Sequence, residues 1–233
     1  MITNKILAII PARGGSKGIP NKNIIDIGGK PLIEYSISPA LALKKSKYIS
    51  EVIVSTDSVN IKNIAENLGV SVPFLRPESI AGDEAKSIDF IKHALEYFES
   101  KDVFFDAVLL LQPTSPLRTY NMLIEAIDIY MSSNSESLIS CYKEEYINDL
   151  VMYRKSKKSN FLEPLNRLHN KGVRRQEHGE VFVRNGAIYL TKTSYLKSNS
   201  QIISDNPVLF EMKKNESINI DGKEDIELLK KYI

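Results

Sequence analysis

The chain has 233 residues, of which 42% are hydrophobic and 26% are charged, and its formal net charge is +2. This length and balance are typical of one globular α/β domain, or of a domain that carries a sizeable insertion. Because the basic residues are scattered, the composition gives no support for broad electrostatic binding to nucleic acid. A single cysteine, Cys141, excludes an intrachain disulfide, and the Cys/His spacings of zinc sites are absent.

The sequence predicts neither a signal peptide nor a membrane anchor. The apolar run near the N-terminus is too short for a signal peptide, and no stretch approaches the ~20 apolar residues of a membrane-spanning helix. We therefore expect a cytoplasmic protein without a membrane partner. Cys141 lies in the apolar run SLISCY, which favours a buried strand thiol over a nucleophile.

Short apolar runs alternate with amphipathic ones in the first half of the chain. The apolar runs, rich in Val, Ile and Leu on both faces, predict buried strands at 5–10, 51–56 and 106–112, and a weaker strand at 70–76. Apolar residues at helical spacing predict helices at 31–45, 58–69, 84–100 and 120–133. This alternation predicts an α/β fold with a mainly parallel sheet and right-handed crossovers.

The pattern changes after about residue 140. Residues 141–180 are polar and irregular, which fits either a flexible excursion or an insertion that packs on a partner subunit. A strand pattern returns at 181–191, and further strands are expected at 207–213 and 217–221. A closing amphipathic helix has acidic residues early and lysines late, as the helix dipole favours.

The stretch ARGGSKGIPNKN, residues 12–23, follows the first predicted strand. Ligands of open α/β sheets bind beyond the carboxyl ends of the strands. Glycines let backbone N–H groups approach an anion, and Arg13, Lys17 and Lys22 supply positive charge. The spacing is neither that of a P-loop nor that of a dinucleotide-binding loop. The pattern favours phosphate binding, with a solvated glycine-rich turn as the alternative.

Two later stretches reach the same edge of the predicted sheet. In LLLQPTSPLRT, residues 109–119, two prolines would hold the polar side chains of the turn in defined places for a ligand. The alternative is a plain strand-to-helix connection in which Thr119 caps the next helix. In SINID, residues 217–221, strand alternation puts Asn219 and Asp221 on one face, where their oxygens could hold Mg²⁺. A strand that ends in a turn is the simpler reading of SINID alone.

Arginines cluster around the strand pattern at 181–191. Arg174, Arg175 and Arg184 could bind a carboxylate, although charge on a solvated loop is the commoner explanation for any one of them. The histidines show no spacing typical of catalysis, and we assign none of them a catalytic role.

Together, these motifs resemble those of acylneuraminate cytidylyltransferases, the CMP-sialic acid synthetases, and of their relatives that activate legionaminic and pseudaminic acid. The resemblance extends from residue 5 to about residue 229. It rests on six stretches in the same order: ARGGSKGIPNKN, VSTD (54–57), RPE (76–78), LLQPTSPLR (110–118), RNGAIY (184–189) and SINID.

The resemblance implies a Rossmann-like nucleotidyltransferase fold with a mainly parallel central sheet and a dimerisation insertion. Residues 1–233 would form a single cytidylyltransferase domain, with the excursion at about 140–180 packing across a homodimer. The implied reaction joins CTP and a nonulosonic acid into CMP-sugar and pyrophosphate, by attack of the anomeric hydroxyl on the α-phosphorus. Such chemistry needs positioning, neutralised phosphate charge and Mg²⁺ as cofactor.

The resemblance also implies roles for individual residues. The implied catalytic residues are Lys22, Arg13 and Asp221, with Lys22 as the main candidate for stabilising charge at phosphorus. The implied nucleotide-binding residues are Arg13, Ser16, Lys22, Asn23, Arg76 and Ser87. The implied sugar-binding residues are Gln112, Ser115, Arg175, Gln176, Arg184 and Asn185. The implied metal ligands are Asp221 and Asn219.

One position departs from the family pattern. Many members carry two aspartates where this chain has Asn219 and Asp221, and an asparagine offers a metal an oxygen but no charge. Metal binding could then be weaker, or the first ligand dispensable. Two alternatives stay open: another sugar nucleotidyltransferase, such as a CMP-Kdo synthetase, which typically has an LQGDEP-like stretch instead of LQPTSP, and a non-catalytic nucleotide- or sugar-binding relative. The motifs do not indicate which nonulosonic acid is used.

Overall fold

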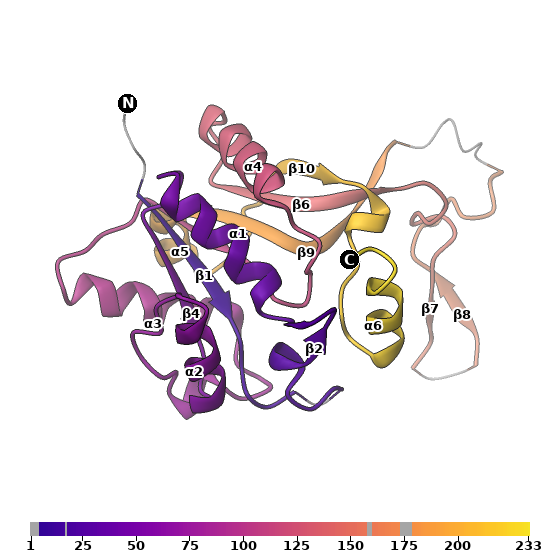
Figure 1. The fold of residues 1–233 in the computed structure, drawn as a ribbon. Helices are drawn as coiled ribbons and strands as arrows, with labels where there is room; N and C mark the ends of the chain where they lie inside the picture. Colours follow the sequence, from indigo (N-terminus) through magenta and orange to yellow (C-terminus); the bar gives the residue numbers. More distant parts are fainter. Residues whose placement is uncertain (1–4, 17, 158–159, 173–178) are drawn as a thin grey trace.

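The computed structural model describes residues 5–16, 18–157, 160–172 and 179–233. A six-stranded sheet with the order β10–β6–β9–β5–β1–β4 forms its centre (Figure 1). β1 pairs in parallel with β4 and β5, and β10 pairs in parallel with β6, whereas β9 is antiparallel to both of its neighbours. The expected mainly parallel sheet is therefore confirmed. The strands are β1 (Ile6–Pro11), β4 (Glu51–Ser55), β5 (Ala107–Leu110), β6 (Ser137–Glu144), β9 (Val181–Lys192) and β10 (Val208–Met212).

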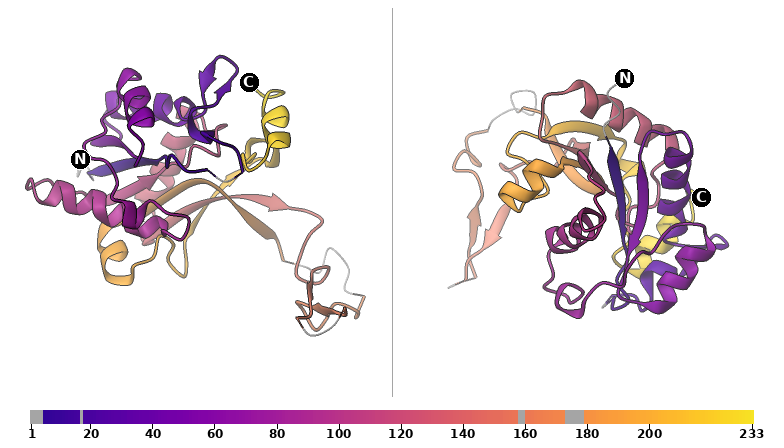
Figure 2. Two further views of the ribbon diagram at one scale, coloured as in Figure 1. Left: turned by 90° about the horizontal axis from the view of Figure 1, so that it is seen from below. Right: turned by 90° about the vertical axis from the view of Figure 1, so that its left-hand side faces the viewer.

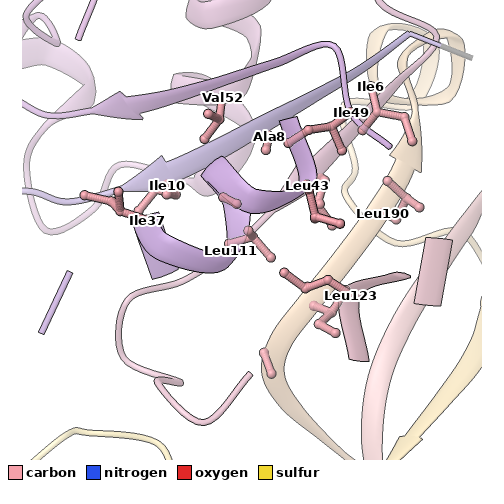
Figure 3. Packing of buried hydrophobic residues seen from close by; sticks show 14 of the residues in the cluster. Ile6, Ala8, Ile10, Ile37, Leu43, Ile49, Val52, Leu111, Leu123 and Leu190 are labelled. Carbon is pink, nitrogen blue, oxygen red and sulfur yellow. The ribbon is translucent and has the colours of Figure 1, made fainter. Parts of the chain in front are cut away.

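Helices cover both faces of this sheet (Figures 1 and 2). One face packs against α1 (Glu34–Lys45), α2 (Val59–Asn67) and α4 (Tyr120–Ser132), and the other packs against α3 (Ser87–Glu99) and α5 (Thr193–Asn199). Strand alternation divides the side chains of β1 between the two cores, because successive residues point to opposite faces. Ile6, Ala8 and Ile10 enter the first core, which Figure 3 shows, and Leu7 and Ile9 enter the second.

Local signals account for the helix ends. The hydroxyl of Ser58 accepts a hydrogen bond from the N–H of Ile61 and begins α2. Gly69, with a φ of 85°, follows the end of the same helix. The hydroxyl of Thr119 accepts a hydrogen bond from the N–H of Met122, so the predicted cap of α4 is confirmed. Cys141 is a free, buried thiol in β6, as expected, and burial raises its pKa.

Two of the expected strands are wrong. Residues 70–76 run parallel beside β4 and its end but make only isolated bridges there, at Ser71 and Leu75, and so form no continuous strand. Residues 217–221 belong to no strand; they follow the short 3₁₀-helix η4 (Lys214–Glu216). A single backbone bond, from the N–H of Ile220 to the carbonyl of Thr114, connects this segment to the turn after β5.

A third, smaller core joins the two ends of the chain. It packs the opening loop and the hairpin β2 (Asp26–Ile27) and β3 (Lys30–Pro31) against the 217–221 segment and α6 (Lys223–Leu229). Ile218 and Ile220 point into this core, and burying an isoleucine stabilises a fold by roughly 1.5–3 kcal/mol. Asn219 and Asp221 are therefore turned the other way, so the predicted alternation holds without a strand.

The excursion leaves the body of the protein at the end of β6 and returns at the start of β9. It carries the small hairpin β7 (Tyr153–Lys155) and β8 (Leu162–Pro164), and Figure 2 shows it projecting away from the sheet. The sheet continues to Glu144 before the excursion begins, so β6 extends past the expected boundary near residue 140. Within the described ranges, none of the helices combines the length and apolar character needed to cross a bilayer.

Candidate active site

A hollow of about 540 Å³ lies where β1 and β5 end, at the carboxyl edge of the parallel strands. It brings together segments that are far apart in the sequence: the opening loop, the start of α3, the turn after β5 and the 217–221 segment. Nine of the side chains named from the sequence line it: Arg13, Ser16, Lys22, Asn23, Arg76, Ser87, Gln112, Asn219 and Asp221.

Hydrogen bonds between its backbone and two side chains hold the opening loop in place. The N–H of Gly14 donates to Asp57 Oδ1 at 2.8 Å, and Asn23 Nδ2 donates to the carbonyl of Arg13 at 3.0 Å. Gly18 comes so close to the 217–221 segment that a Cβ would lie 2.9 Å from the carbonyl oxygen of Asp221. Only glycine allows this approach without movement of backbone, which explains one of the glycines in the motif. Lys17 lies outside the described residues.

Arg13 meets a carboxylate across the hollow. Its Nη1 lies 2.6 Å from Asp83 Oδ1, and each side chain is about one-third exposed, at 33% and 39%. Asp83 comes from the loop between the 3₁₀-helix η2 (Glu78–Ile80) and α3. An anion that binds Arg13 must therefore compete with this carboxylate.

Lys22 links the opening loop to the 217–221 segment. Its Nζ donates to the carbonyl of Ile220 at 2.8 Å and lies 3.7 Å from Asp221 Oδ1. Asn219 Nδ2 lies 3.2 Å from Asp221 Oδ2, so the three side chains form one cluster at the mouth of the hollow. The carboxylate of Asp225 accepts bonds from the backbone N–H groups of Asp221 and Gly222 and thereby fixes the backbone that carries Asp221.

Arg76 supplies a buried positive charge to the same hollow. Its guanidinium donates to the hydroxyl and the carbonyl of Ser55, at 3.2 and 2.7 Å, and lies 4.5 Å from the centre of the Phe90 ring. Burial lowers its pKa to about 10, nearby Asp57 opposes that shift, and Arg13 adds to it. Arg76 therefore stays charged at neutral pH, and the hollow presents several cations to an anionic ligand.

A second hollow, of about 410 Å³, adjoins the first. The two share Ser87 and Gln112, and the remaining lining residues are Leu110, Arg184, Tyr189, Gln201, Ile202 and Ile203. Sequence reasoning missed Tyr189, although it belongs to the RNGAIY motif. It also missed residues 201–203, which stand in no recognisable motif. Only their position after α5 brings these residues beside β5 and β9.

Two of the predicted sugar-binding residues make contacts inside the protein. Ser115, 2% exposed, donates to the carbonyl of Asn185 at 3.3 Å. The amide of Asn185 bonds the hydroxyls of Ser140 and Ser217, at 2.6 and 2.8 Å. Within the described part of the chain, neither side chain lines either hollow; both lie behind them. Arg175 and Gln176 lie outside the described residues.

Comparison with known proteins agrees with this site. The family model described as cytidylyltransferase matches residues 7–232. The chain belongs to the cytidylyltransferase family. The matched range includes each of the segments that line the hollow.

Three relatives of this cytidylyltransferase have names that specify an acid sugar. It is 35% identical to the CMP-N,N'-diacetyllegionaminic acid synthase of Legionella pneumophila, over 98% of this chain and 96% of that one. It is 32% identical to a pseudaminic acid cytidylyltransferase of Campylobacter jejuni, over 97% and 95%. It is 34% identical to the N-acylneuraminate cytidylyltransferase of Escherichia coli, over 96% of this chain but only 51% of that protein. The chain thus spans about half the length of the Escherichia coli relative.

Solved structures show the same fold at low sequence identity. A CMP:2-keto-3-deoxy-manno-octonic acid synthetase in complex with CTP has a TM-score of 0.69 and 18% identity, and the match covers 98% of each chain. A 4-diphosphocytidyl-2C-methyl-D-erythritol synthase of Anaerococcus prevotii has a TM-score of 0.62 and 15% identity, with coverage of 99% and 98%. The expected nucleotidyltransferase fold is therefore confirmed.

Proposed function

We propose that this cytidylyltransferase joins CTP to a nonulosonic acid and releases pyrophosphate. The observation that carries the proposal is the pair of adjoining hollows, one lined by Arg13, Lys22 and Arg76 and the other by Arg184. The names of the relatives support an acid sugar as the second substrate. CMP-sugar and pyrophosphate are the products of such a transfer.

The triphosphate of CTP binds in the first hollow. Arg13 and Lys22 neutralise its charge, and Lys22 stabilises the charge that develops at the α-phosphorus when the anomeric hydroxyl attacks. Binding of the triphosphate frees Arg13 from Asp83. Ser16 and Asn23 support the nucleotide from the same loop, and the remaining nucleotide contacts come from the sheet edge and α3, through Arg76 and Ser87.

The acid sugar binds in the second hollow. Arg184 receives its carboxylate, because a guanidinium binds a carboxylate through two parallel hydrogen bonds. Tyr189 and the apolar side chains at 202–203 offer a surface for the acyl and deoxy groups of the sugar. Gln112 reaches both substrates, since it lines both hollows. Ser115 and Asn185 support the sugar site from behind. Arg175 and Gln176, which lie outside the described residues, are further proposed sugar contacts.

Magnesium is the proposed cofactor, held by Asp221 with help from Asn219. Asp221 is 77% exposed at the mouth of the first hollow. Mg²⁺ is commonly held by one or two carboxylates together with substrate phosphates, and the side chains present fit that arrangement. When bound, the ion would neutralise phosphate charge and assist the departure of pyrophosphate.

The substitution Asn219→Asp tests the role of Asn219. A second carboxylate beside Asp221 is expected to lower the Mg²⁺ concentration that gives half-maximal activity, because it adds charge to the ligand set. The measurement is a Mg²⁺ titration of pyrophosphate release at saturating substrates. An unchanged titration would remove Asn219 from the metal site.

We further propose that the whole chain is one catalytic domain that works as a cytoplasmic homodimer. The excursion is the proposed dimer contact, because several of its apolar side chains are exposed, including Ile147, Val151 and Leu162. The dimer would place the excursion of one subunit near the sugar site of the other.

Pyrophosphate release tests the proposed function directly. The assay contains CTP, Mg²⁺ and, in turn, N-acetylneuraminic, legionaminic and pseudaminic acid, with Kdo as control. Turnover on one nonulosonic acid supports the proposal and identifies the substrate. Turnover on Kdo alone would replace it with a CMP-Kdo synthetase. CTP binding without turnover on any acid would favour a non-catalytic nucleotide-binding protein.

A further inference from the structure

The turn after β5 contains an arginine whose charge is almost wholly inside the protein. Arg118 is 3% exposed. Its Nη1 donates to the carbonyl oxygens of Gln112 and Ala187, at 2.8 and 2.9 Å, and its Nη2 donates to the hydroxyl of Ser36. Among the described residues, no carboxylate lies within ion-pair distance of it.

The two carbonyls belong to segments that meet between the hollows. Gln112 ends the β5 segment and lines both hollows. Ala187 lies in β9 beside Gly186, which has a φ of 75°, and a Cβ on Gly186 would lie 3.0 Å from Gln112 Oε1. The Gln112 side chain therefore rests on the bend in β9, and Arg118 fixes the backbone of both partners.

The same turn also supports the proposed phosphate side of the site. The carbonyl of Thr114 accepts a bond from the N–H of Ile220 at 2.8 Å, and the carbonyl of Ile220 accepts a bond from Lys22 Nζ at 2.8 Å. A shift of the turn would thus move Gln112 directly, and would move Lys22 and Asp221 through Ile220.

A buried arginine without a carboxylate partner costs folding free energy, because burial of a charge opposes folding unless hydrogen bonds compensate. Burial also lowers the pKa of Arg118 to about 9, so the guanidinium is still charged at neutral pH. A guanidinium, however, presents several N–H donors in one rigid plane. It can bond two carbonyls and a hydroxyl from three separate segments, which no neutral side chain of similar volume can do.

We propose that Arg118 is a positioning residue for the transfer reaction: by holding the carbonyls of Gln112 and Ala187, it keeps the turn at the junction of the two hollows and so aligns the acid sugar with CTP. This inference rests on the proposed function. Arg118 itself touches neither substrate; it acts through Gln112 and through the Thr114–Ile220 contact.

Three variants separate positioning from simple stability. Arg118→Met removes the donors, Arg118→Lys keeps a charge that can reach only some of the acceptors, and Ser36→Ala removes the bond to α1 but leaves both carbonyls bonded. For each variant, the melting temperature, the Kd for CTP without sugar, and kcat and KM for both substrates are measured per folded protein.

We expect kcat/KM for the acid sugar to fall by roughly 100-fold in Arg118→Met, because small misplacements of reacting groups cost about that much. Arg118→Lys should show a smaller loss, and its CTP Kd should rise less than that of Arg118→Met. Ser36→Ala should melt at a lower temperature but keep the kinetic constants of the parent. If Arg118→Met does not fold, Arg118→Lys carries the test.

Two results would overturn the inference. One is a folded Arg118 variant with the CTP Kd and kinetic constants of the parent. The other is a Ser36→Ala variant that loses as much activity as the Arg118 variants, since stability alone would then explain both. If the parent binds CTP but turns over no acid sugar, the proposed function fails. The CTP Kd of the Arg118 variants then tests the inference by itself, and a Kd equal to that of the parent overturns it.

Discussion

Asp83 lies where the proposed triphosphate would place its charge. Its carboxylate pairs with Arg13 at 2.6 Å, so CTP must displace it before Arg13 can bind a phosphate. Partly exposed ion pairs contribute about 0.2–1 kcal/mol, which limits the cost of this exchange. Asp83 therefore pairs with the proposed phosphate-binding arginine at small energetic cost.

The substitution Asp83→Asn should tighten CTP binding, by up to about fivefold, because Arg13 no longer has a competing carboxylate. Calorimetric titration with CTP in Mg²⁺ measures the change. Glu78→Gln is the matched control: it removes one negative charge from η2, the element before the Asp83 loop, and Glu78 does not line the first hollow. Weaker CTP binding by Asp83→Asn would mean that Asp83 helps to hold the nucleotide.

Lys22 is a residue whose loss should affect turnover more than folding. Its side chain is 15% exposed and makes one hydrogen bond, to the carbonyl of Ile220. Lys22→Ala should cost about 1.5–3 kcal/mol of stability, as loss of a single charged hydrogen bond does. Turnover should fall by roughly 100- to 1,000-fold, the usual effect of removing a group that stabilises transition-state charge.

Steady-state pyrophosphate release and chemical denaturation of Lys22→Ala measure these two effects. Lys30→Ala, at a lysine on β3 that is 55% exposed, serves as the control. A Lys22→Ala enzyme with nearly normal kcat would contradict the role assigned to this lysine.

At the scale of elements, the end of β6 is joined to η4 by an ion pair. The side chain of Glu144 is 2% exposed, and its Oε2 accepts a bond from Lys214 Nζ at 2.8 Å. Its Oε1 accepts bonds from the backbone N–H groups of Glu145 and Tyr146, each at 3.0 Å. The contact with Lys214 and the N–H of Tyr146 lower the pKa of Glu144 to about 2. The base of the excursion is thus tied to the element that precedes the 217–221 segment.

Because the folded pKa of Glu144 lies below the unfolded value of about 4.3, its contribution to stability is present above that pH and declines as the pH falls toward 2. Glu144→Gln should therefore destabilise the protein at pH 7, and its difference from the parent should narrow at pH 3. Urea denaturation at both pH values measures this. Glu180→Gln, in an exposed pair with Lys143, should change stability little at pH 7. A difference that stays constant with pH would show that the charge of Glu144 is not responsible.

At the scale of the whole molecule, the excursion cannot cover its own apolar side chains. Val151 is 58% exposed and Leu162 is 63% exposed, and a two-stranded hairpin is only marginally stable on its own. A second copy of the chain is the proposed cover. This arrangement would explain why the excursion reads as polar and irregular in the sequence yet carries exposed leucine, isoleucine and valine.

Light scattering after size exclusion should give the parent twice the 26.3 kDa of one chain. The double substitution Val151→Asp and Leu162→Asp should give a monomer, because charged groups oppose burial at an apolar interface. Phe104→Asp, at a 59% exposed residue before β5, should leave the dimer intact. A parent of 26.3 kDa, or a double variant that stays dimeric, would contradict the proposed contact.

Much of the fold could be predicted because it depends on short-range patterns. Runs of Val, Ile and Leu marked the buried strands β1, β4 and β5, and helical spacing marked α1 to α4. Alternation placed Asn219 and Asp221 on one face even though no strand forms there, since Ile218 and Ile220 are drawn into a core. The resemblance of the motifs predicted that the opening loop, the turn after β5 and SINID belong to one site, and the three segments line one hollow.

Contacts between distant segments depended on the tertiary structure. Strand β9 inserts between β5 and β6, and this order, which no local pattern encodes, brings residues 201–203 beside Gln112. The same packing turns Ser115 and Asn185 toward protein partners. It also pairs Arg13 with Asp83 and buries Arg118 against two carbonyl groups. The sequence by itself determined most of the strands and helices of the central fold, the family and the chemical groups at the sheet edge, because these follow from neighbours along the chain. The tertiary structure alone decided which of those groups line the two hollows and which bond to one another, because hydrogen-bond partners and burial are properties of the packed molecule.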